Sequence, residues 1–237
     1  MRIQKYKGGY RSIKNWGYTI KRGQNLQESQ IGKSIYSSEK QDNYYSLIRP
    51  TNFTEYGTVE KLEYLGNPKQ LSCIEIGDIA FSGEGTVGKC VLFSDINARW
   101  ITNIHGIILN KESHDIKESA FVASFLRYLR AIGYFDYVSV GGQGGSLAKK
   151  YWEDIIVPNF PTSIKNRIAD LYCNSIAYPK STPITFKAKD SEWEAKAGII
   201  ELDAMNKKIK CELNCILDSI IHCEDIDISA SIAKLSI

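Results

Sequence analysis

Between about residues 16 and 160 the chain consists of short runs rich in β-branched and aromatic residues, separated by Gly, Asn, Pro and Ser. Such runs are typical of strands. The clearest are residues 44–48, 79–81, 89–93 and 106–109. Across residues 119–132, by contrast, apolar residues recur every three or four positions and Gly133 follows, which predicts an amphipathic helix with a glycine stop. The fold class predicted is α/β: a mainly-β, mixed domain with helices packed on its sheet.

The chain changes character at residues 157–161, which contain Pro158 and Pro161. Two prolines remove backbone donors and hold the chain extended, so we place a domain boundary here and a first domain over residues 1–160. Thr162 or Ser163 can then cap a helix that runs to about residue 174, where later prolines end it.

A second helical segment is predicted from residue 191 to about residue 223, with a patternless tail at 224–237. Its apolar residues recur at steps of three or four, with Lys and Glu between them. They are Leu202, Met205, Ile209, Leu213, Ile216 and Ile220. A stripe of this width predicts packing along another helix, as in an antiparallel coiled coil, and the alternative is that the helix folds back onto the first domain. Residues 161–223 are therefore expected to form a helical spacer or dimerisation arm.

Bulk composition narrows the class of protein. The 237 residues are 43% hydrophobic and 24% charged, as in ordinary globular proteins, and are enough for a sizeable core. The net charge of +3 is compatible with basic patches but does not by itself indicate a nucleic-acid partner. No apolar run approaches the roughly 20 residues of a membrane span, and the first residues do not resemble a signal peptide. We expect a cytoplasmic protein with no membrane partner.

Recognisable catalytic motifs are missing from the sequence. It contains no nucleotide-binding phosphate loop, no dinucleotide fingerprint and no N/D-P-P-Y/F motif of adenine methyltransferases. The glycines of residues 83–89 lie between two strand-like runs, which favours a β-hairpin over a phosphate-binding loop. The 6 cysteines form no C-x-x-C pair, so we expect reduced thiols and no metal. The sequence predicts no enzymatic activity.

Four motifs follow one another between about residues 18 and 168. Residues 44–53 read YYSLIRPTNF, residues 76–89 contain GDIAFS and then GTVGK, residues 144–147 read GGSL, and residues 152–158 read WEDIIVP. This order resembles that of a target-recognition domain in the specificity subunit of type I restriction-modification systems. Two departures are that the family's Gln near the start of the next helix is not found at residues 164–167, and that the chain holds one such module where full subunits have two. It looks like a half-subunit or one excised half.

The resemblance implies a non-catalytic module that reads one half of a bipartite DNA site, in defence against foreign DNA. Implied partners are double-stranded DNA, DNA methyltransferase (modification) subunits, a restriction subunit, and a second recognition module or a second copy of this chain. S-adenosylmethionine is expected on the modification subunit, and no cofactor on this chain. Two copies related by a dyad imply a palindromic, interrupted site. Two alternatives remain open: the recognition segment of a single-chain restriction-methylation enzyme, and an interaction protein that uses the long helix and has no role on DNA.

Candidate DNA contacts are polar residues in the expected loops, because Arg and Lys suit guanine and phosphate while Asn and Gln suit adenine. The glycine-rich residues 141–146 favour ligand contact, although an ordinary surface turn fits them equally. The candidates are Lys21, Arg22, Gln24, Arg49, Asn52, Glu84, Gln143, Ser146, Lys149 and Lys150. Each of them also fits an ordinary solvated residue.

Overall fold

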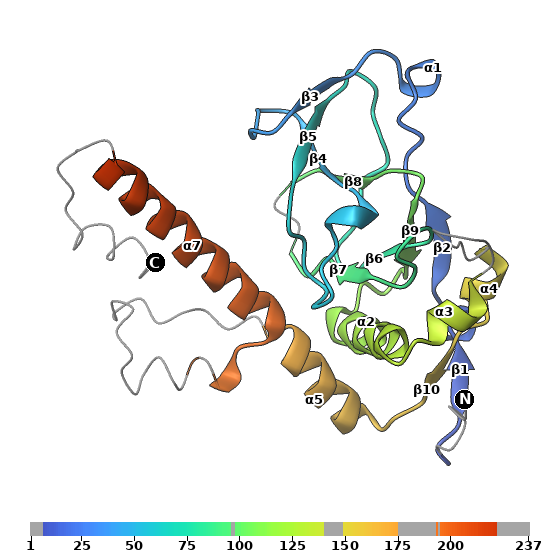
Figure 1. Cartoon of the computed structure of the whole chain (residues 1–237). Helices are drawn as coiled ribbons and strands as arrows, with labels where there is room; N and C mark the ends of the chain where they lie inside the picture. The colour runs from blue at the N-terminus through green and yellow to red at the C-terminus, as the bar shows by residue number, and fades with distance from the viewer. Residues whose placement is uncertain (1–6, 96–97, 140–148, 175–192, 194, 222–237) are drawn as a thin grey trace. The chain divides into compact units, whose positions relative to one another are not determined.

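A computed structural model describes residues 7–95, 98–139, 149–174, 193 and 195–221 (Figure 1). The chain divides into two compact units, Met1–Ala169 and Asp170–Ile237. The first unit holds every strand found in the described residues, and the second holds the longest helix.

Two four-stranded sheets form the framework of the first unit. One is antiparallel, in the order β2 (Thr19–Arg22), β9 (Gly106–Asn110), β6 (Ile79–Ser82), β7 (Cys90–Leu92). The other has the order β3 (Ile35–Ser37), β5 (Glu63–Gly66), β4 (Tyr45–Ile48), β8 (Trp100–Thr102), and its β4–β8 pair is parallel. A separate antiparallel pair joins β1 (Tyr10–Ser12) to β10 (Ile156–Pro158), so the first strand and the proline-rich exit lie side by side. The four strands expected from the sequence are confirmed, and so is the α/β fold class.

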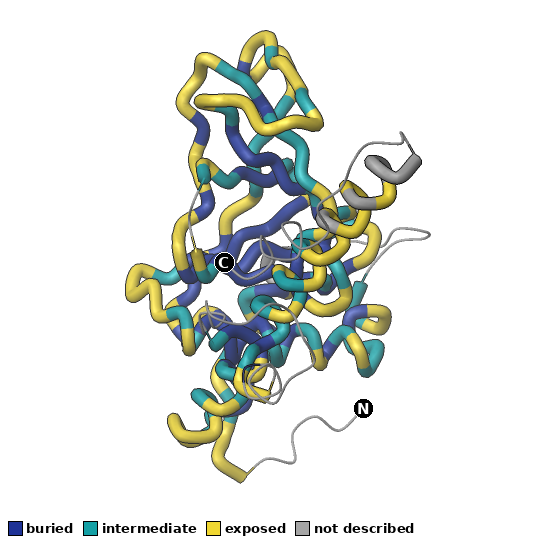
Figure 2. Tube along the Cα trace, turned by 90° about the vertical axis from the view of Figure 1, so that its left-hand side faces the viewer, coloured by how far each residue is buried: buried dark blue, intermediate teal, exposed yellow. Residues whose placement is uncertain are grey.

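The side chains of β4 point alternately to its two faces and belong to two different core clusters. Ile48 joins Phe53 and Ile108 in one cluster, whereas Tyr45 and Leu47 join the other. Because successive side chains of a strand point to opposite faces, a strand buried on both faces is mostly apolar, and in β4 Ser46 is the one small polar residue among the buried Tyr45, Leu47 and Ile48. Figure 2 shows such buried strands in dark blue through the centre of the first unit.

One face of the β2-β9-β6-β7 sheet packs with β4 in the first of these clusters, and helices cover its opposite face. They are α2 (Ile116–Ala131), α3 (Tyr134–Val138) and α4 (Lys149–Glu153). The Phe81 ring of β6 packs against Trp152 of α4 at a centroid distance of 3.7 Å, and Phe135 of α3 packs against the same indole at 5.1 Å. These rings close the apolar layer between the sheet and its helices.

The expected helix at residues 119–132 is confirmed, with a start three residues earlier than its apolar pattern indicates. Asp115 is its N-cap and accepts a hydrogen bond from the backbone N–H of Glu118 at 3.0 Å. Gly133 follows the helix with a φ of 75°, as a glycine stop requires.

Short elements complete the first unit and lead into the second. They are η1 (Lys14–Trp16), α1 (Glu28–Ile31), η2 (Pro50–Asn52) and α5 (Thr162–Tyr172). The last of these confirms the helix expected after the two prolines. Its final residues already belong to the second unit.

The long helix of the second unit, α7 (Ile199–Ile221), begins later than expected. The single helix predicted from residue 191 is interrupted: residues 193, 195 and 196 are helical, residues 197 and 198 are not, and the backbone N–H of Gly198 donates to the Glu201 Oε2 atom (3.0 Å) and so caps a new helix. Residue 191 and the predicted end near residue 223 lie outside the described residues. Glycine also disfavours a helix interior. Of the predicted apolar stripe, Leu202, Ile209 and Leu213 are exposed and Met205 is half-buried. The side chains of Ile216 and Ile220 lie outside the described residues.

Candidate nucleic-acid interface

Three turns of the first unit surround a cavity of about 600 Å³. One follows β4, one joins β6 to β7, and one joins β8 to β9, so the cavity lies where turns from both four-stranded sheets meet. Its lining residues are Arg49, Pro50, Thr51, Ser82, Glu84, Gly85, Thr86, Asn103 and His105. Polar loop residues on a rigid framework are the arrangement by which many proteins present binding groups.

The turn after β4 is held by its own side chains. The Arg49 N–H donates to Asn52 Oδ1 at 2.9 Å, and the Asn52 N–H donates back to the Arg49 carbonyl at 2.8 Å. The Arg49 guanidinium is anchored by Glu63, whose Oε2 lies 3.0 Å from Nε and 2.9 Å from Nη2. One wall of the cavity therefore carries an immobilised cation.

Glu84 in the β6–β7 turn joins two further side chains. Its Oε1 accepts from Arg22 Nη1 at 3.2 Å, and its Oε2 lies 2.5 Å from His105 Nδ1. The hydrogen bond with His105 is the largest influence on this carboxyl, and together with Arg22 it lowers the pKa of Glu84 against the opposing effect of burial. Glu84 is thus ionised at neutral pH and holds both partners at the rim.

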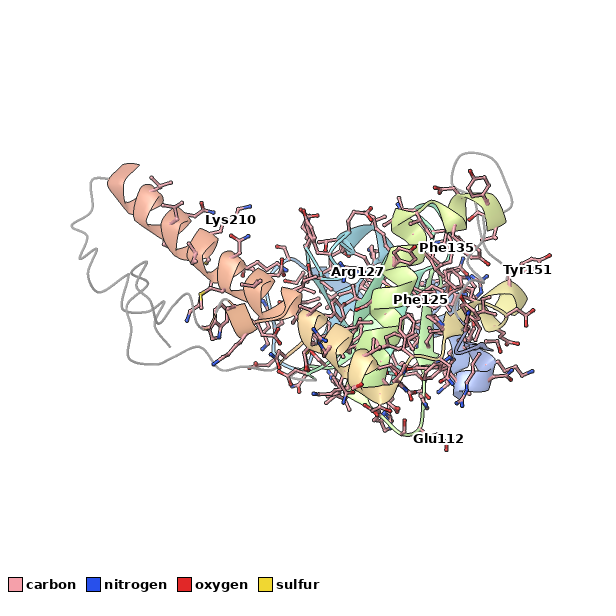
Figure 3. All side chains as sticks on the ribbon, turned by 90° about the horizontal axis from the view of Figure 1, so that it is seen from below. Glu112, Phe125, Arg127, Phe135, Tyr151 and Lys210 are labelled. Atoms are coloured by element: carbon pink, nitrogen blue, oxygen red, sulfur yellow. The ribbon has the colours of Figure 1, made fainter. Side chains whose placement is uncertain are left out.

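A second group of basic residues lies around Glu55 and contacts the β6–β7 hairpin, where Arg130 Nη1 donates to the Val87 carbonyl at 2.7 Å. Lys89 Nζ lies 3.2 Å from Glu55 Oε1, Arg130 Nε donates to Glu55 Oε2 at 3.2 Å, and Arg127 Nε donates to the Glu55 carbonyl at 3.3 Å. Burial alone would raise the pKa of Glu55, but the hydrogen bonds from Arg130 and Lys89 lower it overall. Figure 3 labels Arg127 on α2, the helix that supplies both arginines. Three basic side chains thus contact Glu55: Lys89 and Arg130 at its carboxylate and Arg127 at its backbone carbonyl.

The structure brings together some of the predicted contact residues and separates others. Arg49 and Glu84 line the 600 Å³ cavity, and Arg22 reaches its rim through its hydrogen bond to Glu84. Arg22 also lines, together with Lys21 and Gln24, a smaller cavity of about 260 Å³, in which Gln24 Nε2 donates to the Ser72 carbonyl at 3.2 Å. Asn52 lies beside the larger cavity, where its amide oxygen holds the turn.

The glycine-rich loop at residues 141–146 lies outside the described residues. Gln143 and Ser146 lie outside the described residues. Lys149 and Lys150 begin α4, and their side chains lie outside the described residues as well. These four residues stay predictions.

His105 and Asn103 were missed by sequence reasoning. Their turn joins two strands, and the His105 N–H donates to Asn103 Oδ1 at 3.3 Å. Neither residue belongs to a motif, although their position between two strand-like runs indicates a loop. That signal was available and was not used.

The motif residues behind the family resemblance build the fold. Asp78 of the GDI motif is buried, its Oδ2 accepts from the Glu75 N–H (2.9 Å) and its Oδ1 accepts from Asn110 Nδ2 (2.7 Å). Burial raises the pKa of Asp78 against these hydrogen bonds. In GTVGK, Val87 is buried and Lys89 pairs with Glu55. The motif thus makes the hairpin, which confirms the hairpin expected at residues 83–89.

No helix in the described part of the chain is long and apolar enough to cross a membrane. The same residues contain no group of three or more His, Cys, Asp or Glu side chains that could hold a metal ion.

Among known proteins, the chain is similar to solved structures but to no family model and no curated sequence. The chain is similar to the S subunit of the type I restriction-modification system of M. genitalium, with a TM-score of 0.50 and 13% identity over 90% of this chain and 45% of that chain. This chain therefore spans about half the length of that S subunit.

Two further solved structures resemble the chain less closely in fold. A structure concerning complex assembly and conformational transition of a type I R-M system matches with a TM-score of 0.48 and 16% identity, over 90% of this chain and 46% of that chain. The HsdS subunit of Thermoanaerobacter tengcongensis matches with a TM-score of 0.48 and 16% identity, over 71% of this chain and 38% of that chain. At such identities a likeness is one of fold, and the resemblance seen in the motifs is confirmed at that level by the M. genitalium subunit.

Proposed function

We propose that this chain is a DNA-recognition module without catalysis of its own, which directs a restriction-modification methyltransferase, and the nuclease that acts with it, to one half of a bipartite DNA site. The observation that carries the proposal is a fold that aligns with an S subunit over 90% of this chain. The four sequence motifs, which resemble those of a specificity-subunit recognition domain, support it.

The chemistry of the cavity supports this role. Arg22, Arg49, Glu84, Asn103 and His105 supply guanidinium, carboxylate, amide and imidazole groups at turns, and these are the groups that read base edges in the major groove. The basic residues around Glu55 contact the same hairpin and can neutralise phosphates, which position a protein on DNA without specifying sequence. In this proposal the residues at the cavity read the bases, and the basic residues around Glu55 position the protein on the DNA backbone.

Helix α7 supplies the surface for assembly in this proposal. Leu202, Ile209, Leu213 and Leu217 are exposed at helical spacing, and an exposed apolar stripe of this kind stabilises a helix by packing along another. Because the chain spans about half of the M. genitalium S subunit, we propose that a second recognition module, or a second copy of this chain, supplies the equivalent of the other half. The modification subunits would dock on the paired helices and bring S-adenosylmethionine with them.

The decisive experiment is a map of N6-methyladenine across the genome of the source cell, made with the gene intact, deleted and restored. We expect one interrupted motif to lose methylation on deletion and to regain it on restoration. A palindromic motif would support two copies of this chain, because the symmetry of the site mirrors that of the protein. A map that does not change while the gene is expressed and the methyltransferase is active contradicts the proposal and favours an interaction protein that uses α7.

A binding experiment separates the DNA role from pure protein interaction. Replacing Lys149 and Lys150 together by alanine should weaken binding to duplex DNA and flatten the slope of log affinity against log salt by about two, if both side chains touch phosphate. The measurement is a salt titration of fluorescence anisotropy with a labelled duplex. An unchanged slope would remove this pair from the interface.

A further inference from the structure

Three side chains from separate parts of the sequence converge at the rim of the 600 Å³ cavity. Arg22 ends β2, Glu84 lies in the β6–β7 turn, and His105 lies in the β8–β9 turn. Their side chains remain 50%, 35% and 53% exposed, so all three are accessible to a ligand. Exposed ion pairs contribute about 0–1 kcal/mol to stability. The Glu84 carboxylate therefore contributes little to stability, and its main effect is to hold the Arg22 and His105 side chains in a defined orientation.

The contacts of Arg22 leave part of its guanidinium for a ligand. Nη1 donates to Glu84 Oε1 at 3.2 Å and to the Ile104 carbonyl at 3.1 Å. Among the described residues these contacts use Nη1 alone and leave the Nε and Nη2 donors for a ligand. Arginine then presents a pair of donors in a fixed plane.

The contact of His105 decides which hydrogen-bonding group its other nitrogen presents. An ionised carboxylate can only accept, so the Nδ1 atom that faces Glu84 at 2.5 Å must carry the hydrogen. In the neutral ring the other nitrogen, Nε2, is then an acceptor. Arg22 and His105 thus place two donors and one acceptor around a shared carboxylate.

We propose that Arg22 and His105, oriented by Glu84, read one G·C base pair in the major groove. Arg22 donates to guanine N7 and O6, and His105 Nε2 accepts from the N4 amino group of the paired cytosine. An A·T pair presents the N6 donor of adenine where guanine presents O6, which opposes the second donor of Arg22. This inference rests on the proposed function, since it assigns a target to that DNA site.

The test restores the deleted gene as variants and compares the methylated motifs. Arg22→Ala removes the donor pair. His105→Asn keeps an amide N–H that can reach Glu84 and removes the acceptor at the position of Nε2. Glu84→Gln lets an amide donate to Nδ1, so the ring hydrogen moves to Nε2 and the acceptor becomes a donor. All three should relax the motif at the same G·C pair, with a loss of selectivity of about tenfold for a contact of ~1.4 kcal/mol.

His114→Asn is the matched control. His114 lies outside the cavity lining, its Nδ1 lies 2.9 Å from the Ile76 carbonyl oxygen, and its φ of 48° is one that asparagine tolerates. This variant should restore the wild-type motif. Arg22→Lys serves beside Arg22→Ala, because it keeps the charge and loses the planar fork, and it should relax the same pair.

The outcomes separate this inference from the function on which it rests. If the wild-type gene restores methylation and the variants give an unchanged motif, relax different positions or act at an A·T pair, the G·C assignment is wrong. If the wild-type gene itself restores no methylation, the proposed function fails and the assignment fails with it. Relaxation at one shared G·C pair, with His114→Asn unchanged, supports the assignment.

Discussion

Replacing Gly88 by alanine tests how the hairpin motif supports the first unit. Gly88 has a φ of 94°, and an added Cβ would lie 2.3 Å from Cδ2 and 2.7 Å from Cε2 of the Phe135 ring. That ring is fully buried and packs on Trp152, so it cannot swing away (Figure 3 labels Phe135 on α3). A left-handed backbone costs a non-glycine residue about 1–2 kcal/mol, and overpacking a core costs about 1–3 kcal/mol. The expected loss of unfolding free energy is about 2–5 kcal/mol.

Gly85→Ala is the control that isolates the packing contribution. Gly85 has a similar φ of 72°, but an added Cβ would meet nothing within 4 Å, so only the backbone cost of about 1–2 kcal/mol applies. Thermal denaturation followed by circular dichroism measures both variants. Each kcal/mol shifts the melting temperature of a unit of this size by about 2–4 °C, so Gly88→Ala should melt several degrees below Gly85→Ala. Equal melting temperatures would refute the contact between the motif and Phe135.

Three further predictions concern buried or paired groups. Tyr18→Phe removes the buried bond to the Ser119 hydroxyl (3.0 Å) and should cost about 1–3 kcal/mol in urea denaturation, whereas Tyr36→Phe, at an exposed ring, should cost under about 0.5 kcal/mol. The pKa of Glu55 is lowered by the hydrogen bonds from its cationic partners, which outweigh burial, so its contribution to stability is present at neutral pH and is lost as pH falls through the folded-state pKa. The difference in unfolding free energy between wild type and Glu55→Gln should accordingly shrink between pH 7 and pH 3. Burial raises the pKa of Cys90 to about 12, so a thiol reagent at pH 8 should modify it only after denaturation, and reaction of this residue in the native protein would contradict its burial.

The sequence predicts the elements of this fold better than their pairing. Strands β4, β6, β7 and β9 were expected because their β-branched and aromatic runs are bounded by turn residues. The parallel partnership of β4 with β8 and the pairing of β1 with β10 were not expected. Each joins residues far apart in the chain, and local pattern carries no information about such long-range register. The start of α7 was missed because Gly198 and Glu201 form a cap inside what reads as one helical stripe.

The candidate site shows the same division between local and long-range information. Arg22, Arg49 and Glu84 were each predicted from loop position and side-chain chemistry, one at a time. Their meeting depends on the folded chain, in which the turn after β4 and the β6–β7 turn line one cavity and Arg22 at the end of β2 bonds to Glu84. His105 was missed because its importance arises from the contact with Glu84, and that contact exists only in the folded chain.

In the proposed function, recognition and folding use different residues of the same hairpin. Asp78 and Gly88 belong to the motifs that resemble the family. The Asp78 carboxylate accepts a hydrogen bond from Asn110, and Gly88 packs so close to the Phe135 ring that no side chain fits there. Glu84 lies between those motif positions, is partly exposed and bonds to Arg22 and His105, neither of which belongs to a motif. Substitutions at the exposed residues should therefore change the DNA target with little loss of stability, since exposed pairs contribute about 0–1 kcal/mol. Substitutions at Asp78 and Gly88 should lower stability and leave the target unchanged.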